Sequence, residues 1–226
     1  MELQKHQRML VFASLATIAI WMIPLFRPVL LPLVYFNTHL HELFHALTAM
    51  ATGGVVKHIL VFADGSGVTP VAKGMIVPIA SAGYIGTAVL GGLMIRGSKT
   101  AKLASRTFFA LFVLMAISMV LFVRGDIVGV ISGFAWTILL GIAATRLKDD
   151  WAIFLGKFLG VQLCFTAFHS ILALLSLTVS TPAATDAKLL EQHTFIPAIL
   201  WATLWAIIAL ASVFLSLRSA WDDKRG

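Results

Sequence analysis

Residues 37–54 read Asn-Thr-His-Leu-His-Glu-Leu-Phe-His-Ala-Leu-Thr-Ala-Met-Ala-Thr-Gly-Gly, an apolar stretch that carries polar side chains and ends in two glycines. It contains an H-E-x-x-H motif formed by His41, Glu42 and His45. Residues four apart lie on one face of a helix, so the two histidines can bind one metal ion. The Gly53-Gly54 pair is expected to end this helix, because glycine readily adopts the left-handed conformation of a C-terminal cap.

The motif predicts a zinc site with catalytic chemistry. Imidazole nitrogen is a common zinc ligand, and a catalytic zinc keeps one position open for a water molecule whose pKa it lowers to about 7. Glu42 directly follows His41 and would act as the general base towards this water. The alternative is a chance match, in which the histidines form hydrogen bonds inside an apolar helix.

Composition indicates the class of protein. The chain has 226 residues, of which 59% are hydrophobic and 12% charged, and its mean hydropathy is +0.94. These values are typical of a polytopic membrane protein and exclude an ordinary soluble domain. The basic residues behind the net charge of +7 cluster in short loops, so we expect contact with a lipid bilayer and no nucleic acid partner. A single cysteine, Cys164, excludes an intramolecular disulfide and a cysteine-rich zinc site.

Seven apolar segments are candidates for membrane spans. They are residues 9–26, 29–51, 74–96, 107–123, 127–145, 152–178 and 195–217. We therefore predict one integral membrane domain over residues 1–226, an all-α polytopic fold with six to seven transmembrane helices. Small residues in the segment 74–96 favour close helix packing. Residues 179–194 are expected to form a loop before the last span.

Residues 55–72 differ from the rest of the chain. Residues 55–62 are predicted to form a strand, residues 64–67 a turn and residues 68–71 a short return strand. This predicts a short β-hairpin after the metal-motif helix, whose free edge could bind an extended peptide by strand addition. An ordinary connecting loop is the alternative.

Three other polar residues of the apolar segments bear on the site. Asn37 lies on the same helical stripe as His41 and His45, so it either lines their cavity or forms a hydrogen bond between helices. His39 is expected to point away from this stripe. His169 lies deep in the apolar segment 152–178, where an ionisable residue is either hydrogen-bonded structure or a metal ligand.

Several motifs together resemble the site-2-protease-like integral membrane zinc metallopeptidases, and more narrowly their small bacterial and plant branch. They are the H-E-x-x-H motif, Thr52-Gly53-Gly54, Asp64-Gly65-Ser66-Gly67-Val68-Thr69, Ala82-Gly83-Tyr84-Ile85-Gly86 and Thr185-Asp186-Ala187. The resemblance implies one zinc ion per chain, held by His41, His45 and a third ligand that is usually aspartate. It implies that Glu42 is the general acid/base and that a peptide bond in or near a transmembrane segment of a membrane protein is hydrolysed.

The resemblance leaves the third ligand open between three residues. Asp186 matches the Ser-Asp-Ala region of the branch, with Thr185 in place of the serine, and is our first choice. His169 is the alternate, and Asp126, in Asp126-Ile127-Val128-Gly129, is the third candidate.

The expected location is the bacterial inner membrane, as a multi-pass protein. Two other functions stay open at this point. One is a catalytically inactive metal-binding membrane protein that acts as a scaffold or chaperone. The other is an ion transporter that uses intramembrane histidine and aspartate residues.

Overall fold

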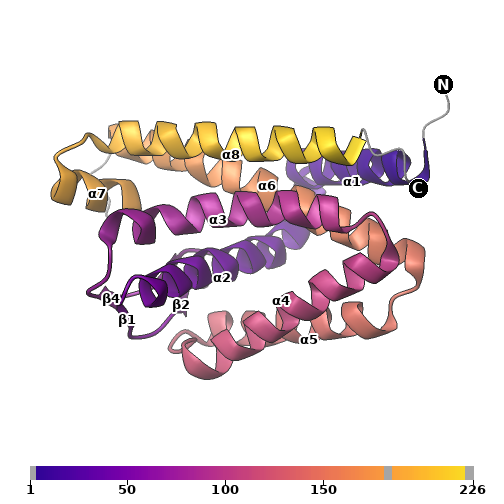
Figure 1. Ribbon diagram of the computed structural model, residues 1–226, viewed down its shortest axis with the longest axis horizontal. Helices are drawn as coiled ribbons and strands as arrows, with labels where there is room; N and C mark the ends of the chain where they lie inside the picture. The colour runs from indigo at the N-terminus through magenta and orange to yellow at the C-terminus, as the bar shows by residue number, and fades with distance from the viewer. Residues whose placement is uncertain (1–3, 181–184, 222–226) are drawn as a thin grey trace.

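The computed structural model of the protein describes residues 4–180 and 185–221, and these residues are mostly helical (Figure 1). The helices are α1 (Lys5–Met22), α2 (Arg27–Ala51), α3 (Ile76–Gly97), α4 (Ala101–Leu121), α5 (Ile127–Arg146), α6 (Asp149–Ser180), α7 (Asp186–Thr194) and α8 (Ala198–Trp221). A short 3-10 helix, η1 (Pro24–Phe26), joins α1 to α2. Four short strands lie between α2 and α3.

Five of these helices, α3, α4, α5, α6 and α8, are long and apolar enough to cross a membrane, and α1 contributes a shorter apolar stretch. Large apolar side chains such as Phe109, Ile138 and Phe214 are more than half exposed on the outside of the bundle. Such exposure is unfavourable in water and favourable against lipid chains. The fold is thus mostly helical, as predicted, with five candidate spans among the described helices against the six to seven predicted; α2 is not one of the five.

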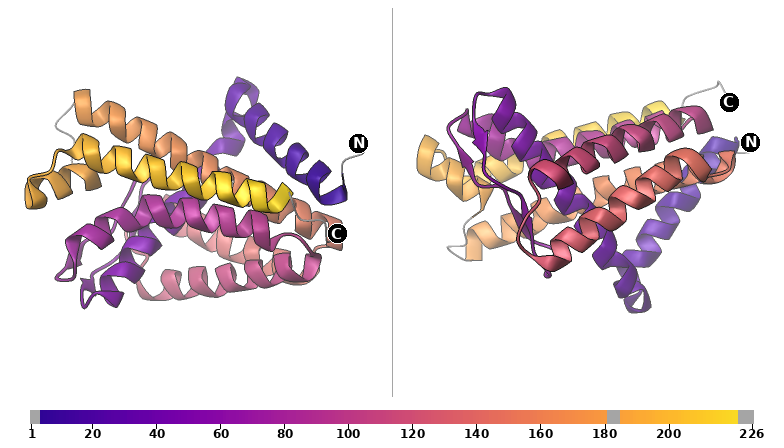
Figure 2. Two further views of the ribbon diagram at one scale, coloured as in Figure 1. Left: turned by 45° about the horizontal axis from the view of Figure 1, so that its top comes forward. Right: turned by 90° about the horizontal axis from the view of Figure 1, so that it is seen from below.

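Helix α3 lies in the middle of the bundle and packs against α2, α6 and α8, while α4 and α5 form an adjacent pair (Figure 1). Helix α1 is tilted away from the others and contacts mainly α6 (Figure 2). Glycines permit the close approach of α3, because a Cβ atom at Gly91 would lie 2.7 Å from the carbonyl oxygen of Gly160. This contact joins α3 to α6. Toward α2, a Cβ atom at Gly86 would lie 2.5 Å from the ring of Phe44, so small residues let α3 approach both helices closely.

The segment after α2 is a β-hairpin, as predicted. Strand β1 (Val55–Val56) pairs with β4 (Val71–Ala72), and β2 (Leu60–Val61) pairs with β3 (Gly67–Val68), both antiparallel. Two side chains of α2 bind the turn between β2 and β3: Tyr35 donates to the carbonyl oxygen of Ala63 and Thr38 to that of Gly65, each at 2.7 Å. These bonds hold the hairpin alongside α2.

The prediction of a loop over residues 179–194 is wrong for residues 186–194, which form helix α7; residues 181–184 lie outside the described part of the chain. The hydroxyl of Thr185 caps this helix by accepting a hydrogen bond from the backbone nitrogen of Lys188. Ala187 and Leu190 are buried on its inner face. Capping and tertiary burial stabilise a short helix whose polar composition resembles a loop.

Candidate metal centre

His41 and His45 lie one turn apart in the second half of α2, and their ring centroids are 4.6 Å apart. The Nδ1 atom of His45 lies 2.6 Å from the carbonyl oxygen of Ile79 in α3. Because a carbonyl oxygen only accepts, Nδ1 carries a proton, and Nε2 is therefore the nitrogen of His45 that is available to a metal ion. A backbone carbonyl that orients a histidine in this way is typical of metal sites.

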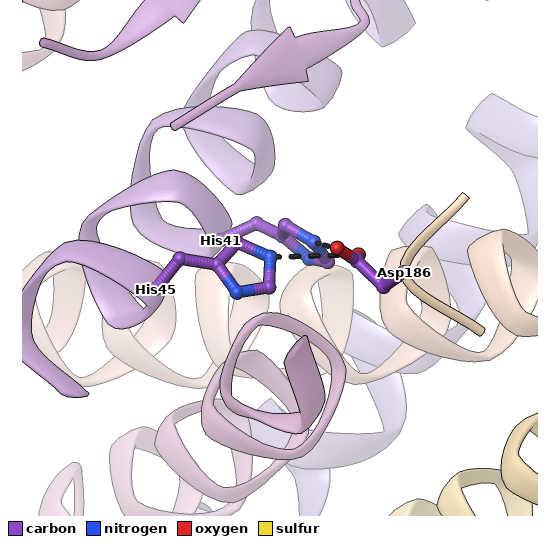
Figure 3. Close-up of side chains that lie close together, drawn as sticks. All are labelled: His41, His45 and Asp186. Atoms are coloured by element: carbon purple, nitrogen blue, oxygen red, sulfur yellow. Dashed lines mark ion pairs between the residues drawn. The ribbon is translucent and has the colours of Figure 1, made fainter. Parts of the chain in front are cut away.

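Asp186, the first residue of α7, faces both histidines (Figure 3). Its Oδ2 atom lies 3.7 Å from Nε2 of His41 and 3.5 Å from Nε2 of His45. The potential ligand atoms of the three residues all lie within 4.8 Å of one another. Two ligand atoms about 2.1 Å from a tetrahedral zinc ion lie about 3.4 Å apart. The two distances from Asp186 are close to this value, and the donor set has the chemistry that zinc prefers.

The charge state of Asp186 also suits a metal ligand. Burial by itself would raise the pKa of this carboxyl group, but the attraction of His45 and hydrogen bonds with both imidazoles hold the pKa below its usual range. Metal ions bind the deprotonated form of a carboxyl group. Asp186 therefore offers a carboxylate to any cation placed between the three side chains.

Glu42 is buried, with 5% of its surface exposed, and its Oε2 atom accepts a 2.7 Å hydrogen bond from the hydroxyl of Thr69. Thr69 belongs to the return half of the hairpin. Gly67 also contacts the carboxylate closely, since a Cβ atom there would lie 2.7 Å from Oε1. The hairpin thus forms a hydrogen bond with one carboxylate oxygen of Glu42, and the backbone of Gly67 packs against the other.

A cavity of about 940 Å³ opens beside these residues. Its lining includes the hairpin segment 65–71, the side chains of the H-E-x-x-H motif and, from α7, Asp186 and His193. Asn37 also lines the cavity, which was the first of the two alternatives predicted for this residue. The cavity is large enough for several residues of an extended peptide together with water.

The other predicted candidates lie elsewhere. His169, on α6, is exposed, and its ring centroid lies 4.8 Å from that of Trp21. Asp126 caps α5 by accepting hydrogen bonds from the backbone nitrogens of the two residues after Ile127. His39 is directed away from the pair, and its Nε2 lies 3.1 Å from both the carbonyl oxygen of Gly129 and the hydroxyl of Ser132.

Sequence reasoning did not single out the residues of α3 and α8 that surround His41. The ring of Tyr84 meets that of His41 edge-on at 4.6 Å and stacks on Trp205 at 5.0 Å. The indole nitrogen of Trp205 donates to the hydroxyl of Ser81 at 3.0 Å. Tyr84 and Thr69 belong to motifs of the family resemblance, but nothing in the sequence pattern connected Ile79 or Trp205 with the site.

Comparison with protein-family models matches residues 11–216 to the family described as Peptidase M50B-like. The chain belongs to this family. The match covers most of the chain and confirms the resemblance to site-2-protease-like proteins, which are membrane metallopeptidases. Members of the wider M50 family typically use zinc, which the histidine–histidine–aspartate group of this M50B-like chain would suit. Comparisons with curated proteins and with solved structures gave no match.

Proposed function

We propose that this M50B-like protein is a zinc-dependent intramembrane endopeptidase, which hydrolyses a peptide bond in or near a transmembrane segment of a membrane protein. The observation that carries the proposal is the convergence of His41, His45 and Asp186 beside the buried Glu42, in a cavity within a bundle of apolar helices. With one or both of α1 and α2 counted in addition to the five candidate spans, the domain would have six to seven transmembrane helices.

In this proposal His41, His45 and Asp186 hold one zinc ion per chain. When bound, zinc would polarise the scissile carbonyl group and activate water for attack. Oε1 of Glu42 takes the proton of the attacking water and passes it to the leaving amine, while Thr69 keeps Oε2 in place. The carboxylate is thereby oriented for proton transfer by a hydrogen bond from the hairpin.

The hairpin would also bind the substrate. A transmembrane helix satisfies its own backbone hydrogen bonds, so a segment of it must unwind before a peptide bond can be cut. The segment 65–71 lines the cavity and could pair with the unwound stretch by strand addition. This interaction would compensate for the backbone hydrogen bonds that the substrate loses.

The zinc content of purified, detergent-solubilised protein tests the ligand set. We expect one zinc ion per chain in the parent and in His169→Ala, and loss of most of it in His45→Ala and Asp186→Ala, because a structural or catalytic zinc needs at least three protein ligands. Elemental analysis by mass spectrometry gives the ratio. A parent that neither carries zinc nor takes it up on addition contradicts the proposal, and retention by Asp186→Ala removes Asp186 from the ligand set.

Thr69→Val tests the support of Glu42 by the hairpin. The variant keeps the shape of the side chain but loses the hydroxyl that donates to Oε2 at 2.7 Å. We expect cleavage of a membrane-embedded peptide to slow about 10-fold at unchanged zinc content, as for loss of one hydrogen bond to a charged group. Thr107→Val, in which an exposed hydroxyl bonded within α4 is removed, should cleave at the parental rate. Equal rates for the two variants would show that the bond has no role in turnover.

A further inference from the structure

Asn37 has an unusual environment for a buried amide. Only 5% of its surface is exposed, and its Oδ1 atom has no hydrogen-bond partner among the described residues. A buried oxygen without a hydrogen bond is unfavourable unless a ligand or a water molecule donates one to it. The side chain lines the cavity that also contains Glu42, so any such partner would enter from there.

The turn of the hairpin is bound by the side chain next to this amide, and Oδ1 of Asn37 stays unpaired among the described residues. Thr38, the next residue, already binds the turn through the carbonyl oxygen of Gly65. Two other buried side chains have unpaired atoms in the described part of the chain, Nζ of Lys157 and Nε2 of Gln162, and neither residue belongs to the cavity lining. Asn37 is therefore the one of these three that faces the space beside the metal centre.

We propose that Asn37 binds the main chain of the substrate, with Oδ1 accepting from a peptide N–H and Nδ2 donating to a peptide carbonyl. This inference rests on the proposed protease function and adds a substrate-binding residue to it. A carboxamide presents the same donor and acceptor pair as a peptide group, so it can bind an extended chain of any sequence. The residue would take up backbone groups that the substrate exposes on unwinding.

The position of Asn37 on α2 sets the register of this contact. It precedes His41 by four residues, which corresponds to about 6 Å along a helix axis. An extended peptide advances about 3.3 Å per residue. Asn37 would therefore bind the substrate about two residues from the cleaved bond, along the same stretch that the segment 65–71 borders.

Binding of a defined peptide tests the inference without need for turnover. The probe is a fluorescein-labelled transmembrane peptide, rich in leucine and alanine with a central Gly-Gly pair, in lipid nanodiscs. Its affinity is measured by fluorescence anisotropy in zinc-loaded protein that carries Glu42→Gln, alone or combined with Asn37→Leu or Gln162→Met. We expect Asn37→Leu to weaken binding about 10-fold and the matched change of a buried amide, Gln162→Met, to leave it within about 2-fold.

Two further readouts separate substrate binding from a structural role. Asn37→Leu should keep its zinc and a melting temperature at least equal to the parent's, because no hydrogen bond of Oδ1 within the protein is lost. In addition, N-methylation of one peptide nitrogen about two residues from the central pair should weaken binding to the parent but not to Asn37→Leu. Lower stability or lost zinc in Asn37→Leu would assign the residue to folding and overturn the inference.

The remaining outcomes are distinct for the two proposals. Equal affinity of Asn37→Leu and its parent, or no affinity of the parent for the probe, overturns the inference on Asn37. A protein with intact Glu42 that binds the probe in an Asn37-dependent way and never cuts it overturns the protease proposal, while substrate binding by Asn37 is retained.

Discussion

Glu42→Gln is expected to abolish cleavage of a membrane-embedded peptide while the protein keeps its zinc. The amide has the shape of the carboxylate, and its oxygen can still accept the hydrogen bond from Thr69, so the fold and the cavity should be unchanged. It cannot take a proton from water, and loss of a general base typically reduces turnover by about 10²–10⁴-fold. The cleavage rate in proteoliposomes and the zinc content of the same preparation measure the two effects.

Asp64→Asn is the matched control for this variant. Asp64 is an exposed acid in the hairpin turn, where its Oδ1 accepts hydrogen bonds from the backbone nitrogen and the hydroxyl of Ser66. Removal of this charge should leave cleavage at the parental rate. Equal cleavage by Glu42→Gln and the parent would show that Glu42 is not the general base. A parent that binds zinc and shows no proteolysis would instead favour the inactive metal-binding protein considered from the sequence.

The parts of the site that could be predicted are those encoded by local spacing. His41, Glu42 and His45 are neighbours on one helix, and helical geometry alone predicts that the histidines share a face. The hairpin was predictable for the same reason, since turn residues at 64–67 separate two short apolar runs. The apolar runs that became α3, α4, α5, α6 and α8 are long enough for length and composition to identify them.

The position of Asp186 beside the histidines could not be predicted from spacing. It is far from α2 along the chain, and only the family motif connected it with the site; the structure brings it close because α7 packs against α3 and α8. Helix α7 itself was missed, because its burial through Ala187 and Leu190 is a tertiary contact. The carbonyl oxygen of Ile79 was missed for a similar reason, as any residue type could supply it.

Gly83→Ala is expected to disrupt the metal centre from the neighbouring helix. Gly83 of α3 packs against the imidazole of His41 so closely that an added methyl carbon would overlap the ring, coming within 2.5 Å of Cδ2. The ring has little freedom to move away, because Tyr84 contacts it edge-on and is itself stacked on Trp205. We expect zinc affinity, measured by competition with a chelating dye, to fall about 100-fold, and cleavage to fall with it.

Gly97→Ala, in the same helix, is the control for Gly83→Ala. At Gly97 the added carbon would meet only the hydroxyl of Thr107, at 3.2 Å, which can yield by rotation. Alanine is a better helix former than glycine by up to about 1 kcal/mol, so Gly97→Ala should melt at the same or a higher temperature and keep its zinc. Both substitutions replace a glycine of α3 by alanine, hence a loss of zinc confined to Gly83→Ala must come from the displaced imidazole. Parental zinc affinity in Gly83→Ala would mean that His41, in this orientation, is not a ligand.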